Sequence, residues 1–421
     1  QAQDAYRYAC ERQYAFETEL REHGRRALEY LDAHPQTFGI VLFGRPYNAF
    51  TTDANMGIPH KVASRGYLIL PHDMLPADEH QVDIKMFWAM GQKIMKAAQF
   101  VKNRDNLFGF YITNFSCGPD SFLVGYVRRE MGRKPSLTLE LDQHTADAGI
   151  DTRIEAALDI IQRYRRSNLP PVTMSRFRPA KLEGGKNPRV IASDGTVLSF
   201  RDPRVEVIIP SMGEYAAQAV AAVFRSSGIR AVALPVPDEE VLLLGRKNTT
   251  CKECLPYIVT TGSMLKHLLK RSDPKKVTLF LMATGSGPCR LGQYWRALEH
   301  LIEREQIPNA AVLSVSDESS YAGLGFRLLL KAVQGIYVAD IMGDIRSTLS
   351  VTAKDPAFAM AELERGWNQF IAYFEGRLSL RFSTLVSMVS RTLAKVPLKQ
   401  DPRDVPTISL VGEIFVRREE F

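Results

Sequence analysis

The spacing of hydrophobic residues changes repeatedly along the chain. Short apolar runs, many of them β-branched, alternate with segments in which apolar residues recur about every 3.6 positions. In the first half, strands are predicted at 38–43, 67–71, 107–115 and 136–142. Helices are predicted near 54–65, 82–102, 119–132 and 151–166. Because parallel strands need a long crossover connection, this alternation predicts a parallel sheet covered by helices.

The same alternation starts again in the second half of the chain. Strands are predicted there at 205–210, 231–236, 277–283 and 311–316. Helices are predicted near 213–227, 255–270, 290–305 and 322–334. We therefore predict an α/β fold with two tandem Rossmann-like domains, at 37–170 and 204–350, although no residue-level repeat relates them. An amphipathic helix is predicted in the N-terminal segment 1–36.

Two further segments join or follow these domains. Residues 171–203 are a linker in which Asp194-Gly195 lies between two β-type runs, a pattern typical of a hairpin turn. Residues 351–421 are predicted to be helical at first and to end in an apolar strand at 407–417. Since no helix follows that strand, we expect it to open a further α/β unit and the chain to be a fragment of a longer polypeptide.

The composition restricts the class of protein. Hydrophobic residues make up 45% of the chain and charged residues 24%, as in an ordinary globular protein. No apolar run approaches the ~20 residues of a membrane span, and the N-terminus lacks the basic and apolar regions of a secretory signal. We therefore expect a cytoplasmic protein without a membrane partner. The net charge of +7 is spread along the chain without interleaved aromatics, so we expect no nucleic-acid partner.

The five cysteines carry most of the candidate chemistry. An odd number of cysteines without a secretory signal indicates reduced thiols, which more often bind metal or react than cross-link. Cys117 and Cys289 each follow the third strand of their domain, at the edge where open α/β sheets bind ligands. Cys254 opens the helix before 277–283, where free N–H groups lower the pKa of a thiol. Cys10, in the N-terminal segment, is expected to have no role.

Three thiolates on loops rich in glycine and proline could hold an iron–sulfur cluster between the two domains. Two other interpretations stay open from the spacing alone. The cysteines could be small buried apolar residues, since free cysteine is often buried. Cys251 and Cys254 form a C-x-x-C pair, which also suits zinc or a redox dithiol.

Further candidates lie on the same loops. Arg45 follows the first strand and could bind an anionic group or could only stabilise the structure of its loop. Ser116 and Gly287 precede motif cysteines and are candidate cofactor contacts, because backbone N–H groups of such loops can donate to cluster sulfurs. The sequence contains no G-x-G-x-x-G, P-loop, H-E-x-x-H or G-x-S-x-G pattern, so none of those common sites is predicted.

Five segments, in order along the chain, resemble the acyl-CoA dehydratase activase-related proteins, a family linked to 2-hydroxyacyl-CoA dehydratases and benzoyl-CoA reductases. They are FGRPYNAFTTDANMGIPHKVASRGYLILPHDMLP at 43–76, FSCGPDSF at 115–122, CKECLPYIVTTGSMLKHL at 251–268, SGPCRLGQY at 286–294 and LVGEIFVR at 410–417. The resemblance implies that Cys117, Cys254 and Cys289 ligate a [4Fe-4S] or double-cubane cluster, with Cys251 as a less secure ligand.

The resemblance also implies a function. We expect an iron–sulfur protein of anaerobic acyl-CoA metabolism that passes low-potential electrons, coupled to ATP hydrolysis, to a dehydration or reduction. Its partners would be an ATPase activator module or another electron donor, with an acyl-CoA as a possible substrate, and we expect an oligomer. No ATPase motif is evident in this chain. The alternatives are a cluster-free scaffold for an ATPase activator, or a CoA-ester enzyme with Cys289 as nucleophile.

Overall fold

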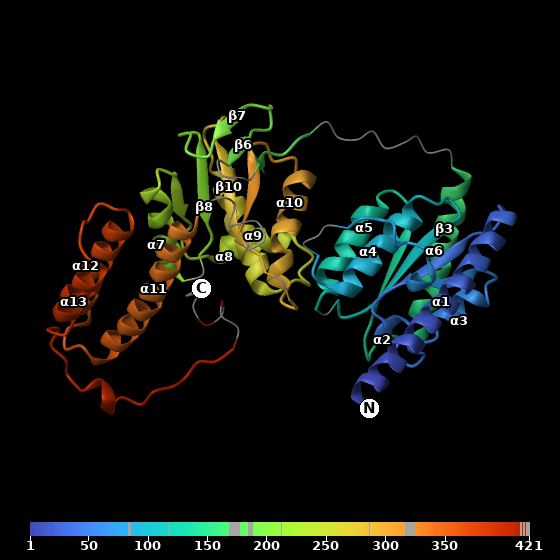
Figure 1. Ribbon diagram of the computed structural model, residues 1–421, viewed down its shortest axis with the longest axis horizontal. Coiled ribbons are helices and arrows are strands. Elements are labelled where there is room, and N and C mark those ends of the chain that lie inside the picture. The colour runs from blue at the N-terminus through green and yellow to red at the C-terminus, as the bar shows by residue number, and fades with distance from the viewer. Residues whose placement is uncertain are drawn as a thin grey trace. The chain divides into compact units, whose positions relative to one another are not determined.

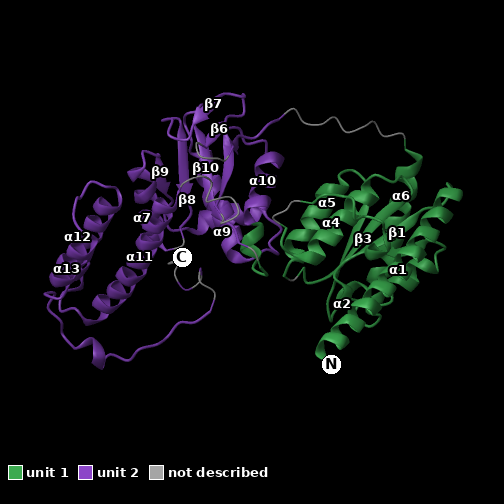
Figure 2. Ribbon diagram, in the orientation of Figure 1, with its two compact units in different colours: residues 1–175, 286–293 green, residues 176–285, 294–421 purple. Residues whose placement is uncertain are grey.

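The computed structural model divides into two compact units (Figure 2). Unit 1 comprises residues 1–175 and 286–293, and unit 2 comprises 176–285 and 294–421. The structure describes residues 1–82, 86–116, 118–167, 177–183, 188–211, 213–285, 287–315, 325–412, 415 and 417. Both units contain a parallel sheet with helices, and unit 2 adds a helical C-terminal region. The predicted fold class is therefore confirmed.

Unit 1 is built on a four-stranded parallel sheet in the order β2-β1-β3-β4 (Figure 1). Its strands are β1 (Gly39–Phe43), β2 (Leu68–Pro71), β3 (Leu107–Asn114) and β4 (Ser136–Leu141). Its helices are α1 (Ala2–Ala33), α2 (Pro46–Ala49), α3 (Ile58–Ala63), the 3-10 turn η1 (His72–Met74), α4 (Ala89–Lys102), α5 (Asp120–Met131) and α6 (Asp147–Arg166).

The central strands of unit 1 are buried on both faces. Every residue of β1 is buried, which explains its continuous apolar run. Ile40 and Leu42 pack in one cluster with residues of α3 and α6. The alternate residues Val41 and Phe43 point to the opposite face, because successive side chains of a strand alternate.

Unit 2 repeats the arrangement of unit 1. Its parallel sheet has the order β11-β10-β8-β9, so each of its strands has the same neighbours as its counterpart in unit 1. The strands are β8 (Val205–Ile209), β9 (Ala231–Ala233), β10 (Val277–Ala283) and β11 (Ala310–Val315). The helices are α7 (Glu214–Ser226), α8 (Glu239–Asn248), α9 (Leu255–Leu269) and α10 (Tyr294–Arg304). The 3-10 turn η2 (Arg290–Gln293), which precedes α10 in the sequence, belongs to unit 1.

A small antiparallel sheet packs beside the sheet of unit 2. It consists of β5 (Lys181–Glu183), β6 (Arg189–Ile191) and β7 (Val197–Ser199). The predicted hairpin turn lies between β6 and β7, and Gly195 has a φ of 89°, which favours glycine. Val190 and Leu198 of this sheet join the apolar cluster of β8 and β10.

Three C-terminal helices extend unit 2 on the outer side of α7. They are α11 (Phe326–Thr352), α12 (Pro356–Phe374) and α13 (Phe382–Leu393). Ala217, Ala221 and Phe224 of α7 face the sheet, whereas Tyr215 and Ala219 face the added helices. Helix α7 is thus buried on two sides, consistent with its run of alanines.

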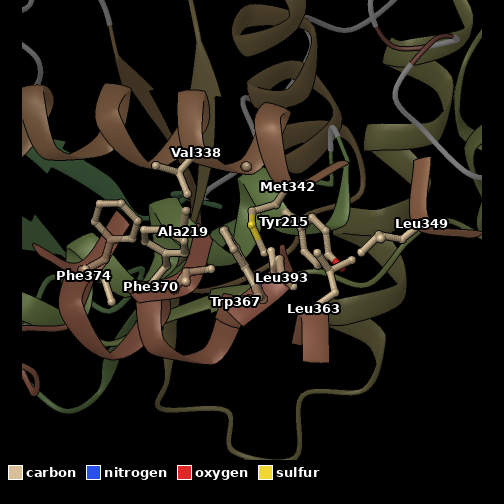
Figure 3. Packing of buried hydrophobic residues seen from close by; sticks show 14 of the residues in the cluster. Tyr215, Ala219, Val338, Met342, Leu349, Leu363, Trp367, Phe370, Phe374 and Leu393 are labelled. Atoms are coloured by element: carbon tan, nitrogen blue, oxygen red, sulfur yellow. The ribbon is translucent and has the colours of Figure 1, made fainter. Parts of the chain in front are cut away.

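The core of this helical region is centred on Trp367, of which only 1% is exposed (Figure 3). Phe370 and Phe374 lie on the same helix, and Val338 and Met342 of α11 complete the contact. The indole Nε1 donates to Oε1 of Gln218 at 2.6 Å, so its buried N–H has a partner.

The structure differs from the prediction at three elements. Helix α8 was not predicted, although Asp238 caps it by accepting from the N–H of Val241 at 2.9 Å. Helix α11 runs 27 residues, far beyond the predicted end at 334. Within 407–412, the described part of the predicted final strand, no strand is formed, because an apolar run becomes a strand only where another strand pairs with it. No described helix is long and apolar enough to cross a membrane.

Candidate functional site

The reversal of strand order marks the place for a site in each sheet. Successive connections leave the first strand in opposite directions, toward β2 and β3 in unit 1 and toward β9 and β10 in unit 2. Open α/β sheets bind ligands in the crevice at the carboxyl ends of these strands. In unit 1 the loop after β1 carries Arg45, and the loop after β3 carries Ser116.

A buried charged network fixes this end of unit 1. Asp120, in the first turn of α5, is fully buried and lies 3.2 Å from Nη2 of Arg45. Its carboxylate also accepts from the hydroxyl of Tyr111 at 3.0 Å and from Thr113 at 2.7 Å. Burial, followed by the neighbouring Asp120, raises the pKa of Tyr111 well above its ordinary value, so the phenol stays protonated and donates.

The loop that follows β3 has an unusual backbone. Phe115 and Ser116 have φ values of 55° and 49°, and Gly118 has 59°. Non-glycine residues rarely adopt this left-handed region, and such strain concentrates at functional sites. Ser116 is buried, whereas 60% of Phe115 is exposed. Cys117, between them and Gly118, lies outside the described residues.

Two side-chain amides at the same end of the sheet each have one buried atom without a hydrogen bond within the described residues. Nδ2 of Asn48, on α2, and Oδ1 of Asn114, at the end of β3, are buried and make no hydrogen bond within the described residues. A buried polar atom without a partner costs stability, so such atoms mark places where a ligand or water binds. The sequence analysis missed these amides and Asp120. The sequence did contain a signal for the buried carboxylate: Tyr111 and Thr113 place hydroxyl groups at alternate positions of an apolar strand, where they need a buried partner.

Cys289 belongs to unit 1, and this differs from the prediction that it serves the second domain. Its segment, 286–293, interrupts unit 2 in the sequence but groups with unit 1 by its contacts, and Figure 2 gives it the colour of unit 1. Nη1 of Arg290 lies 3.4 Å from Oγ of Ser121, and the carbonyl of Gln293 accepts from the hydroxyl of Tyr126 at 3.2 Å. The Cys289 thiol is exposed and free of a disulfide. Contact with α5 therefore brings this segment to the helix that follows Cys117.

Cys254 lies in unit 2, at the N-terminal end of α9. It is the N-cap residue, half-buried, and its Sγ is hydrogen-bonded to the hydroxyl of Tyr294. The ring of Tyr294 packs 5.1 Å from that of Tyr257, which fixes the phenol beside the thiol. A helix N-terminus stabilises a thiolate, because its first N–H groups and dipole favour negative charge.

A close crossing of α8 and α9 positions this helix end. A methyl group added at Gly262 would lie 2.0 Å from the carbonyl oxygen of Val241, so only glycine permits this approach. Cys251, in the connecting loop, is exposed, has a φ of 59° and points its Sγ to the carbonyl of Arg246 at 3.5 Å. The C-x-x-C pair therefore has one thiol in contact with solvent and one held by a tyrosine.

The donor chemistry of these residues fits thiolate ligation, because four cysteines are free and three of them lie on the loops expected from the sequence. Within the described part of the chain, however, no three His, Cys, Asp or Glu side chains lie together as a metal site. Cys117 is outside that part. Gly287, a further candidate, has a φ of 126°, and Cys10 is exposed on α1.

Residues 1–75 match a family model described as the CoA enzyme activase uncharacterised domain (DUF2229). The match includes Arg45 and ends three residues after His72, but it contains none of the four cysteines discussed as ligands. No curated protein and no solved structure matches the chain significantly. Residues 1–75 are therefore similar to a domain of CoA enzyme activases, which supports the resemblance to the acyl-CoA dehydratase activase-related proteins.

Proposed function

We propose that this protein is an iron–sulfur component of a CoA-ester activating system. In this proposal Cys117, Cys254 and Cys289 ligate a [4Fe-4S] or double-cubane cluster, and Cys251 is a possible fourth ligand. The activase match supports the system, and the observation that carries the cluster is Cys254, a free thiol at the start of α9. A bound cluster would supply one-electron chemistry at low potential.

The protein's own residues would prepare and tune the ligands. Cys254 lies at the N-terminus of α9, and its sulfur is hydrogen-bonded to the hydroxyl of Tyr294, which would hold the sulfur in place as a ligand. The Arg45 and Asp120 pair holds the first turn of α5 and so the end of the strained loop that contains Cys117. The buried side chain of Ser116 fixes the other end of that loop.

The activase match also supports the class of partner. We infer that the protein acts with a dehydratase or reductase component whose substrate is an acyl-CoA, and that an ATPase module drives the electron transfer.

Anaerobic preparation tests the cluster directly. We expect the protein, purified without oxygen, to contain iron and acid-labile sulfide and to absorb near 400 nm. Cys254→Ser and Cys289→Ser should each lose most of the iron, whereas Cys10→Ser, an exposed cysteine on α1, should retain it. An iron-free wild-type protein, or equal iron in Cys254→Ser and Cys10→Ser, would contradict the proposal.

A cluster-free interaction module is the second candidate. One observation favours it: α11 exposes large apolar side chains at helical spacing along one face, and such faces often bind partners. These residues are Phe326, Leu330, Val333, Tyr337 and Ile341. The same anaerobic preparation separates the two candidates, because a scaffold would be colourless and would still bind its ATPase partner.

A further inference from the structure

Helix α11 is apolar on two opposite sides. On its inner side, Val338, Met342 and Leu349 belong to the cluster around Trp367 (Figure 3). Its outer face exposes a row of large apolar side chains, each between 40% and 68% exposed, namely Phe326, Leu330, Val333, Tyr337 and Ile341. A helix that is apolar all round is normally buried all round, so this outer face indicates a contact with a further surface.

The outer face has the shape of a helix–helix contact. Its five residues follow one another at intervals of four, three, four and four positions, which keeps them in one row along the helix. From Phe326 to Ile341 the row is about 23 Å long, at roughly 1.5 Å per residue. A second helix lying along the row can pack against all five side chains at once.

The exposed charges at the two ends of the outer face have opposite signs. Arg327 lies in the first turn of α11, and Asp344 lies one turn beyond Ile341. The two residues are about 25 Å apart along the helix, so they cannot pair within one chain. A second copy of α11 that runs antiparallel would place its Asp344 beside Arg327, and the reverse at the other end. Parallel pairing would bring like charges together, so the charges favour the antiparallel arrangement.

The remaining charged residues of α11 lie away from the row. Nζ of Lys331 is 5.8 Å from the ring centre of Tyr373 on α12, and the guanidinium of Arg346 is 6.0 Å from the ring centre of Tyr215 on α7. Asp340 is half-buried. Arg327 and Asp344 are therefore the exposed charged residues that a partner of α11 would meet.

One two-fold axis accounts for both the charged and the apolar contacts. The midpoint between Arg327 and Asp344 lies at 335–336, and the midpoint between Leu330 and Ile341 is the same. In an antiparallel pair centred there, Leu330 packs on Ile341 of the second copy while Arg327 meets its Asp344. That carboxylate also approaches the first turn of α11, which contains no acidic residue of its own and favours negative charge.

We infer that the outer face of α11 is the contact between two copies of this chain, paired antiparallel about a two-fold axis. Because each copy offers the same surface, the contact closes with two chains. The inference goes beyond the proposed function and does not depend on the cluster, since α11 contains no cysteine. In the dimer the second copy, and not an ATPase partner, covers this face.

Sedimentation velocity of the full chain, over a range of protein concentrations, tests the inference. We expect a particle of twice the 47.3 kDa of one chain that dissociates on dilution. Leu330→Glu would bury a carboxylate on each side of the contact and should raise the dissociation constant at least about 100-fold. Leu243→Glu, the same change at a similarly exposed leucine of α8, should leave it unchanged. A monomer at every concentration, or a dimer that Leu330→Glu does not weaken, would overturn the inference.

Exchanging the two charges tests the antiparallel register and provides a second measurement if Leu330→Glu does not fold. Arg327→Asp and Asp344→Arg should each weaken the dimer about tenfold at low salt, because each brings like charges together at both ends of the contact. The double variant restores opposite charges and should regain the wild-type dissociation constant. Since the two residues cannot reach each other within one chain, this recovery reports a contact between chains. A double variant as weak as the single variants would refute the register.

Discussion

Replacing His72 with phenylalanine should make unit 1 more resistant to acid. Burial lowers the pKa of His72 to about 4, from an ordinary value of 6.5, and the nearby charge of Lys93 lowers it further. As the pH falls below 6.5, the unfolded chain takes up a proton that the folded chain refuses until about pH 4. The free energy of unfolding therefore decreases across this window.

The size of the effect follows from the difference in pKa. At about 1.4 kcal/mol for each unit of pKa, His72 lowers the stability of unit 1 by about 3 kcal/mol between pH 7 and pH 4. Phenylalanine cannot titrate, and it can pack between Phe43 and Phe50, whose rings lie 6.4 and 5.3 Å from the imidazole. The variant should therefore lose about 3 kcal/mol less than the wild type.

Hydrogen exchange measures this difference within unit 1. Peptides that cover β1 and β2, beside His72, should lose protection on acidification in the wild type and in His60→Phe, the same change at an exposed residue, after correction for the intrinsic exchange rate. The same peptides of His72→Phe should lose much less. Asp73, whose pKa is raised chiefly by burial, is present in all three proteins, so its opposite contribution cancels. An equal loss of protection in His72→Phe would refute the reasoning.

Two further predictions concern buried contacts. Arg45→Met should destabilise unit 1 by about 3 kcal/mol in urea unfolding, because it leaves the carboxylate of Asp120 buried without its cation. Asp120→Asn, which removes that charge, should destabilise unit 1 clearly less. A larger loss of stability in Asp120→Asn than in Arg45→Met would contradict the pairing. Gly262→Ala should lower the stability of unit 2 by about 1 to 3 kcal/mol, because its methyl group would meet the carbonyl of Val241. Gly125→Ala, on an open face of α5, is the control and should be neutral or stabilising by about 0.5 to 1 kcal/mol. Similar melting temperatures for Gly262→Ala and Gly125→Ala would show that α8 and α9 do not cross closely at Gly262.

The predictions that succeeded rest on local patterns. The apolar run of β1 is buried at every position, and the polar turn at Asp194-Gly195 forms a hairpin, because both depend on neighbours in the sequence. Helix α8 was missed because its three leucines between charged residues show no clear period, although Asp238 is a typical N-cap. Residues 407–412 begin with alternating polar and apolar residues, as a strand can, but form no strand in the structure, since a strand needs a partner that its own sequence cannot supply.

The candidate site was predicted only in part. The sequence indicated that Cys254 begins a helix and that Arg45 follows a strand, and both positions are as expected. It could not indicate that Arg45 pairs with Asp120, 75 residues away, or that Tyr294 contacts the thiol of Cys254. Such contacts depend on how strands are ordered in the sheet and on how helices cross.

The amino-acid sequence by itself determined the alternation of strands and helices, the class of fold and the loops on which the cysteines lie. These properties depend on the period of apolar residues and on turn chemistry, which act over a few positions. Only the tertiary structure decided that the Cys289 segment packs with unit 1 and that His72 is buried beside the rings of Phe43 and Phe50. The physical reason is that burial and partner choice are set by residues far apart in the chain, whose proximity exists only after the sheets and helices have packed.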